Sequence, residues 1–163
     1  MSISHKNSKN MIKVDSEIHC YITSLKNILN IYKNLNYSTF IFDIVKKINS
    51  IDKFLLVEIE SLFNYLIRNN IFTKENLNLK LLNIISDLRS QDNYILYKHN
   101  NIPLTLNELI EDESRWQALI KAKNKDSDLN KIILKNLTSY IKLRKTFINS
   151  HLPDIMNILE NLI

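Results

Sequence analysis

Glycine is absent from this sequence, and cysteine and proline are scarce, with one Cys and two Pro in 163 residues. Loops that cradle phosphate groups use glycine where the backbone takes a positive φ or approaches the ligand closely. The sequence therefore excludes the P-loop, the dinucleotide-binding fingerprint and the α/β-hydrolase nucleophile elbow as motifs. Their absence counts against most classes of nucleotide-dependent enzyme.

A single cysteine, Cys20, leaves no partner for an intramolecular disulfide and no cage of thiolates for zinc. We expect Cys20 to be buried as a small apolar side chain. The histidines His5, His19 and His99 show no spacing typical of a metal site. The sequence thus predicts no bound metal and no cofactor.

Long hydrophobic runs are also missing, since no segment approaches the roughly 20 apolar residues of a membrane-spanning helix. The first ten residues are polar and are not followed by the apolar core of a signal peptide. We therefore expect a cytoplasmic protein, located in the host cytosol if the source is a pathogen or virus. Residues 1–11 are predicted to form a flexible tail and residues 12–163 a single helical domain.

Alanine is scarce as well, and Ile, Leu, Asn and Lys are abundant instead. This composition indicates an A/T-rich genome. Apolar residues still make up 45% of the chain and charged residues 24%, proportions typical of a globular domain with a core. Apolar side chains recur at intervals of three and four residues from about Asp15 almost to the end, which is the helical period. The sequence therefore predicts an all-α protein, a compact bundle of about seven helices. The expected helices cover about 15–35, 38–48, 54–67, 73–88, 105–120, 127–148 and 153–162.

Polar and turn-forming residues set these predicted boundaries. Asn49-Ser50 is expected to separate the second helix from the third, and Pro153 to open the last. Asn69-Asn70 is expected to end the third helix, because asparagine tolerates the left-handed conformation common at helix ends. Thr73 is expected to cap the fourth helix, and Ser38 the second.

The stretch from residue 91 to 105 differs from the rest, with aromatic and branched residues on both sides of Asn100-Asn101. An Asn-Asn pair suits a tight turn, so a small β-hairpin is one interpretation of this stretch. Pro103 limits strand pairing, so a plain loop is an equal alternative. Thr105 and Glu108 then match a capping box at the start of a helix.

Basic charge gathers in residues 121–145, which hold eight Lys or Arg and two Asp, a net charge of +6 against +5 for the whole chain. Four of these lysines fall on one face of the predicted helix from 127 to 148: Lys131, Lys135, Lys142 and Lys145. We call them the lysine row. Such a row predicts binding to an acidic partner, either another protein or the phosphates of a nucleic acid. The alternative is a helix face that only meets solvent.

Arg144 lies on the apolar side of the same predicted helix, and His151 follows it with six residues between them. This Arg-x6-His spacing resembles the short motif of HEPN ribonucleases, a family of small all-helical proteins. The resemblance implies that Arg144 and His151 meet in a cleft, often at a dimer interface, and cleave RNA without metal. The competing interpretation is a structural arginine, with its stem in the core and its guanidinium paired with a carboxylate.

Elimination favours a non-enzymatic helical module that binds another protein. An adaptor or chaperone, an immunity or inhibitor protein, and an effector of a pathogen or virus are all roles of this kind. The alternative is a protein directed at nucleic acid, either through the lysine row or as a HEPN-like ribonuclease. The two hypotheses differ in one structural requirement, because the ribonuclease needs Arg144 and His151 to converge in an open cleft.

Overall fold

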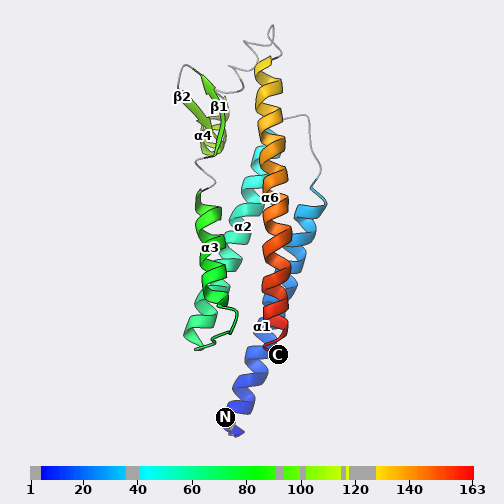
Figure 1. Cartoon of the computed structure of the whole chain (residues 1–163), viewed down its shortest axis with the longest axis vertical. Coiled ribbons are helices and arrows are strands. Elements are labelled where there is room, and N and C mark those ends of the chain that lie inside the picture. The colour runs from blue at the N-terminus through cyan, green and yellow to red at the C-terminus, as the bar shows by residue number, and fades with distance from the viewer. Residues whose placement is uncertain (1–4, 36–40, 91–93, 100–101, 115–116, 118–127) are drawn as a thin grey trace.

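The computed structural model describes residues 5–35, 41–90, 94–99, 102–114, 117 and 128–163 (Figure 1). Within these residues, five helices and one small antiparallel sheet form an elongated bundle. The predicted all-α class is therefore confirmed. The elements are α1 (His5–Lys33), α2 (Ile41–Arg68), α3 (Leu77–Ser90), β1 (Ile95–His99), β2 (Ile102–Thr105), α4 (Leu106–Glu111) and α6 (Asp128–Glu160).

The prediction of about seven helices is wrong, because two expected breaks do not occur. Helix α2 runs without interruption through Asn49-Ser50, where the sequence predicted a boundary. Its buried stripe continues across this point, from Ile48 to Leu55, at intervals of four and three residues. Ser50 itself is exposed, so its hydroxyl meets water and does not disturb the packed face. Packing of the continuous stripe thus overrides the local preference of Asn and Ser for a turn.

Helix α6 likewise runs through Pro153, which the sequence placed at the start of a separate helix. Proline removes one helical hydrogen bond, the one to the carbonyl four residues earlier, here that of Asn149. Asn149 and Pro153 are both exposed, so that carbonyl is accessible to water. On the opposite side, Leu152 and Ile155 stay buried and hold the helix in place.

Two other expected helices differ from the prediction at one end. Helix α1 begins at His5, so residues 5–11, expected as part of a tail, are helical, and among the residues from 15 on, whose burial is described, the first buried one is Ile18. In Figure 1 the first turns of α1 extend past the ends of the other helices. Helix α4 ends at Glu111, and after a turn at Asp112 the residues 113, 114 and 117 are again helical, while the other residues of the expected helix up to 120 lie outside the described ranges. The expected cap Ser38 also lies outside the described residues.

Several predicted local signals are confirmed. Asn70 follows the end of α2 with a φ of 52°, in the left-handed region. The Thr73 hydroxyl accepts a hydrogen bond of 2.9 Å from the Leu77 N–H at the start of α3. The Thr105 hydroxyl accepts one of 3.2 Å from the Glu108 N–H at the start of α4. These contacts satisfy N–H groups that the helices leave unpaired at their first turns.

Of the two interpretations of residues 91–105, the hairpin is the one present, as strands β1 and β2, which pair antiparallel. Pro103 lies in β2 opposite Lys98, and the pairing becomes irregular between Ile95 and Tyr97. A two-stranded sheet has only edge strands, so a proline can occupy one without removing a needed ladder bond. Strand β1 packs against α6, and the Asn136 side chain donates a hydrogen bond of 2.5 Å to the Leu96 carbonyl.

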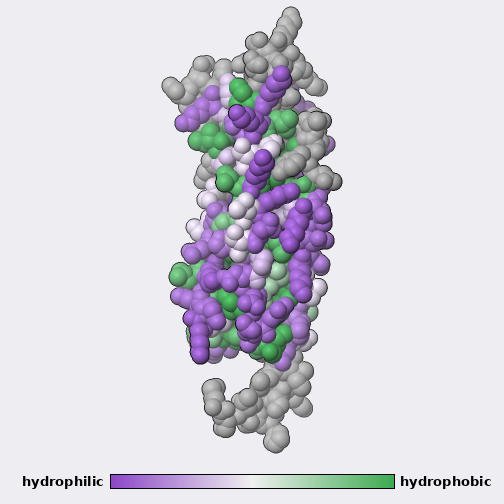
Figure 2. Space-filling model, turned by 45° about the vertical axis from the view of Figure 1, so that its right-hand side comes forward, coloured by the Kyte–Doolittle hydropathy of each residue, from purple (hydrophilic) through white to green (hydrophobic). Residues whose placement is uncertain are grey.

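The core consists of two apolar clusters arranged along the bundle. The first, which we call the α3 core, lies where α1, α2 and α3 meet the C-terminal half of α6. The second, the hairpin core, lies where the start of α2, the hairpin and α4 meet the N-terminal half of α6. On the face drawn in Figure 2, hydrophilic side chains cover most of the described surface, with separate apolar areas between them.

Candidate functional site

Two charged side chains are buried in the described core, Asp52 on α2 and Arg144 on α6, with exposed fractions of 6% and 7%. The Asp52 carboxylate accepts hydrogen bonds from two tyrosine hydroxyls. One comes from Tyr32 on α1, and the other, at 3.3 Å, from Tyr140 on α6. These contacts join three helices through one buried carboxylate.

Arg144 connects this group to α3. Its Nη1 donates to the Asp87 carboxylate at 2.5 Å, and its Nη2 lies 3.5 Å from the Tyr140 hydroxyl. The guanidinium carbon also lies over two aromatic rings, 5.7 Å from the centroid of Tyr140 and 5.5 Å from that of Phe147. We refer to Tyr32, Asp52, Asp87, Tyr140 and Arg144 as the polar network.

Helical spacing explains how the network assembles. Tyr140 and Arg144 are four residues apart on α6, so they lie on one face, one turn from each other. Asp52 occupies a position of the buried stripe of α2 between Ile48 and Leu55. Tyr32 lies in the last turns of α1, where its ring packs in the core and its hydroxyl reaches Asp52.

The polar network lies between the two apolar clusters. Along α2, Ile48 belongs to the hairpin core and Leu55 to the α3 core, with Asp52 between them. Burying a charge is costly unless its partners are in place, and breaking a buried pair costs about 3–5 kcal/mol. A shift of α1 or α6 by one turn would separate Asp52 from its tyrosines. The network therefore favours the observed register of the helices over shifted ones.

Burial changes the protonation of these groups. It raises the pKa of Asp52 from 3.8 to about 6, and the Arg144 charge and the two tyrosine hydrogen bonds oppose that rise. Burial, together with the Asp52 charge, also raises the pKa of Tyr32 and of Tyr140, so both hydroxyls stay protonated and donate. For Arg144, burial lowers the pKa, but Tyr140, Asp52 and Asp87 outweigh it and keep the guanidinium charged.

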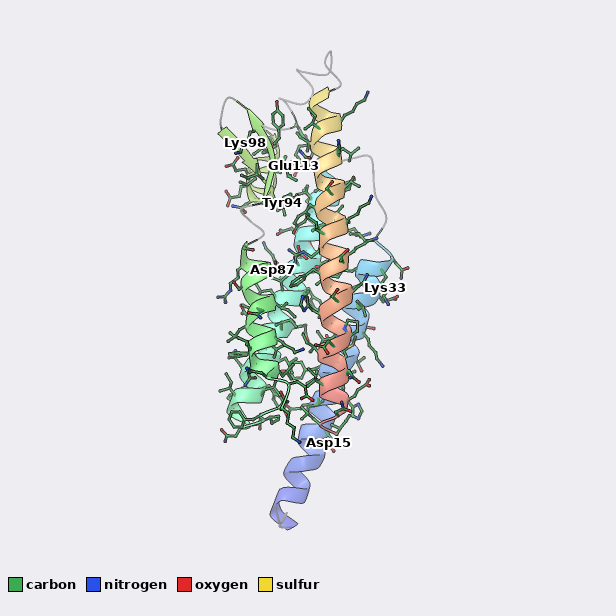
Figure 3. All side chains as sticks on the ribbon, viewed as in Figure 1. Asp15, Lys33, Asp87, Tyr94, Lys98 and Glu113 are labelled. Carbon is green, nitrogen blue, oxygen red and sulfur yellow. The ribbon has the colours of Figure 1, made fainter. Side chains whose placement is uncertain are left out.

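A pocket of about 350 Å³ opens beside the network, between the end of α3 and α6. Figure 3 shows Asp87 near the end of α3 and Tyr94 next to the hairpin, with α6 alongside both. Tyr140 and Arg144 connect the pocket to the buried Asp52. The lining residues are Asp87, Ser90, Tyr94, Tyr140, Leu143, Arg144 and Phe147.

Arg144 and His151, the pair suggested by the ribonuclease resemblance, lie on the same side of α6 but do not line one pocket. Arg144 is buried and bonded to Asp87, while His151 is half-buried and absent from the pocket lining. The ring of Phe147 lies between them, 4.3 Å from the centroid of the His151 ring. Seven residues of helix separate the two positions by about 10 Å along the axis.

The lysine row lies on the face of α6 that points away from the core. Lys131, Lys135 and Lys142 are exposed, and none of the three forms an ion pair with another residue that the structure describes. Lys145 differs, because it is half-buried and its Nζ donates to the Leu35 carbonyl at 3.2 Å. It lies at the edge of the row, on the side nearer the buried stripe.

Two further expectations concern Cys20 and metal binding. Cys20 is exposed rather than buried, because the packed face of α1 carries Ile18, Ile22 and Leu25 and Cys20 projects away from it. Within the described ranges, no group of three or more His, Cys, Asp or Glu is placed to hold a metal ion. No helix in the same ranges combines the length and apolar character needed to cross a membrane.

Asp52, Tyr32 and Tyr140 were not predicted from the sequence as site residues. The sequence of α2 nevertheless contains a pattern that indicates a buried carboxylate. Positions 48, 52, 55, 59 and 62 follow the alternating spacing of a buried stripe, and Asp52 is the one charged residue among them. A carboxylate in such a stripe predicts buried donors on the neighbouring helices.

The comparisons with known proteins give no relative from which a function can be transferred. No protein-family model, no curated protein and no solved structure matches this chain.

Proposed function

We propose that this chain is a non-enzymatic helical module that binds another protein through the outer face of α6. The observation that carries the proposal is the composition of that face. Lys131, Lys135 and Lys142 are exposed in one row, and two large apolar side chains border them, Ile132 with an exposed fraction of 41% and Leu143 with 62%. Protein interfaces combine apolar contact with a charged or polar rim in this way.

The positive charge of the outer face of α6 indicates the chemistry of the partner. Three ammonium groups along one helix face create a positive potential that favours an acidic surface. Nucleic acid would also be attracted, but recognition of single strands usually adds aromatic or arginine side chains that stack on bases. The exposed residues of the lysine row include no aromatic side chain and no arginine. Exposed Ile132 and Leu143 favour a protein partner, since apolar side chains gain little from phosphates.

The environment of Arg144 supports a binding role over catalysis. A ribonuclease would need its guanidinium at the reacting phosphate and a histidine within reach of the same atoms. Here the guanidinium is engaged by Asp87 and Tyr140, and His151 lies beyond the ring of Phe147. A structural role accounts for each of these contacts.

The test compares two triple variants of equal charge. The first changes Lys131, Lys135 and Lys142 to Gln, and the matched control changes the exposed Lys26, Lys47 and Lys53 of α1 and α2 to Gln. Each protein is cross-linked in native cells and purified, and cross-linked peptides are mapped by mass spectrometry. We expect one acidic protein to be cross-linked to α6 in wild type and control, and lost in the first variant. Both variants should fold, because exposed substitutions usually change stability by less than about 0.5 kcal/mol each.

Nucleic acid is measured on the same samples. Co-purifying nucleic acid, with a log–log salt slope near −3 that the first variant abolishes, would contradict the proposal and favour a nucleic-acid binder. Metal-independent RNA cleavage by wild type, lost in Arg144→Ala and His151→Ala while both keep their melting temperatures, would favour the ribonuclease instead.

A further inference from the structure

The pocket beside the polar network has the size and lining of a small-ligand site. Its volume of about 350 Å³ lies within the roughly 300–1,000 Å³ typical of such sites. It lies between the end of α3 at Ser90 and the start of the hairpin, alongside α6 (Figure 3). It is separate from the lysine row, which lies on the outer face of α6.

Aromatic rings form much of the pocket wall. Tyr94 and Tyr140 pack with ring centroids 4.6 Å apart, and Phe147 follows two turns along α6 from Tyr140. The faces of such rings attract cations within about 6 Å of the centroid. Arg144 already uses this attraction, since its guanidinium lies within that distance of Tyr140 and Phe147. The wall is therefore suited to positive charge carried on an apolar body.

The charged groups around the pocket also favour a positively charged ligand. Two carboxylates, Asp87 and Asp52, accompany one guanidinium, that of Arg144, so the group carries about one net negative charge when all three are ionised. The Asp87 side chain is 40% exposed and is the carboxylate that lines the pocket. Arg144 also lines the pocket, but its guanidinium is already engaged by Asp87 and Tyr140, and the exposed part of the Asp87 side chain can pair with an ammonium group, whereas it would repel an anion.

We propose that this pocket binds a compact organic cation, an ammonium group on an aromatic or aliphatic body, with the ammonium paired to Asp87 and the body packed on Tyr94, Leu143 and Phe147. The same chemistry is offered by a free amine and by a basic side chain of another protein. Leu143 borders both this pocket and the outer face of α6, but the tests of the two sites change different charged residues, Asp87 here and Lys131, Lys135 and Lys142 there, so each proposal can fail alone.

Three probes of matched size test the sign of the charge. Phenethylammonium carries a positive charge, 2-phenylethanol none and phenylacetate a negative one. Titrations followed by calorimetry and by amide NMR shifts should rank the cation first, about tenfold tighter than the alcohol, with phenylacetate weakest. The shifts should centre on Ser90, Tyr94 and Leu143. A titration with N-acetyl-lysine amide distinguishes the sources, because tighter binding than phenethylammonium would indicate a protein side chain.

Asp87→Asn should weaken phenethylammonium binding about three- to tenfold and leave 2-phenylethanol nearly unchanged. Its amide oxygen can still accept from Arg144, so we expect the variant to fold. Asp154→Asn is the matched control, because Asp154 also pairs a residue of α3 with α6, through Lys80, but does not line the pocket. Leu143→Gln, at a position 62% exposed, tests the apolar wall without disturbing the core and should weaken both ligands.

Several outcomes would overturn the proposal. Tightest binding of phenylacetate would show that Arg144, not Asp87, recognises the ligand. Equal binding of the three probes would show apolar contact without recognition of charge. Equal effects of Asp87→Asn and Asp154→Asn, or no binding of phenethylammonium, would remove the cation site altogether.

Discussion

Replacing Arg144 by alanine should destabilise the protein mainly through Asp52. Arg144 is 7% exposed, and its removal takes away the positive charge that opposes the rise in the pKa of the buried Asp52 carboxyl. Losing one partner of a buried pair costs about 3–5 kcal/mol. Asp87 limits the loss because its side chain is 40% exposed and can be hydrated. We therefore expect Arg144→Ala to lower the free energy of unfolding by about 3 kcal/mol at neutral pH, or the melting temperature by about 6–12 °C.

The cost should depend on pH in a defined direction. Asp52 has a pKa of about 6 in the folded protein, above its ordinary value of 3.8. The folded state therefore binds this proton more tightly, and the contribution of Asp52 to stability is largest at low pH and is lost as pH rises through 6. Near pH 5 the Asp52 carboxyl is protonated in the variant, so it carries no charge in the core. The cost of Arg144→Ala should then fall to about 1 kcal/mol, the value of its lost packing.

Urea unfolding followed by circular dichroism measures these differences at about pH 7.5 and about pH 5. Asp52→Asn supplies the control, since asparagine keeps an acceptor for the tyrosine hydroxyls but has no charge to leave unpaired. The double variant with Arg144→Ala should recover about 1–2 kcal/mol at the higher pH and almost nothing at the lower. An Arg144→Ala cost that is equal at both pH values, or not reduced by Asp52→Asn, would refute the argument.

Two further predictions concern the ends of the bundle. Pro153→Ala should raise the free energy of unfolding by about 1–3 kcal/mol, since it restores a hydrogen bond inside α6, whereas the exposed control Asn157→Ala should gain less than about 0.7 kcal/mol. A loss of stability in Pro153→Ala would show that the proline is needed for packing. Deleting residues 1–11 should change the melting temperature by less than about 5 °C, because the described core begins at Ile18. A larger drop in the same thermal scan would mean that this segment packs on the domain.

The sequence alone was enough to predict helical structure and several of the residues at which helices begin or end. Apolar spacing of three and four residues identified the packed faces, since side chains at those intervals must lie on one side of a helix. Thr73, Thr105 and Asn70 were predicted correctly as end signals because capping is a contact between near neighbours in the chain. The hairpin was one of two open interpretations, because Asn100-Asn101 suits a tight turn whereas Pro103 limits strand pairing.

Local signals failed where packing over a whole helix competed with them. Asn49-Ser50 and Pro153 each weaken a helix by an amount that the sequence can indicate. Whether the helix ends there depends on the apolar stripe that continues beyond, from Ile48 to Leu55 in α2 and from Leu152 to Ile155 in α6. The sequence showed those stripes but not that neighbouring helices cover them without a gap.

The candidate site depended on the tertiary structure. The sequence placed Arg144 on an apolar face, but only packing brings it to Asp87, 57 residues away in the chain. Asp52 and Tyr140 are separated by 88 residues, and their hydrogen bond requires α2 and α6 to lie in one register. Helical periodicity determines which way a side chain points, whereas the packing of the helices determines which partner it meets. The polar network and its pocket both result from that packing.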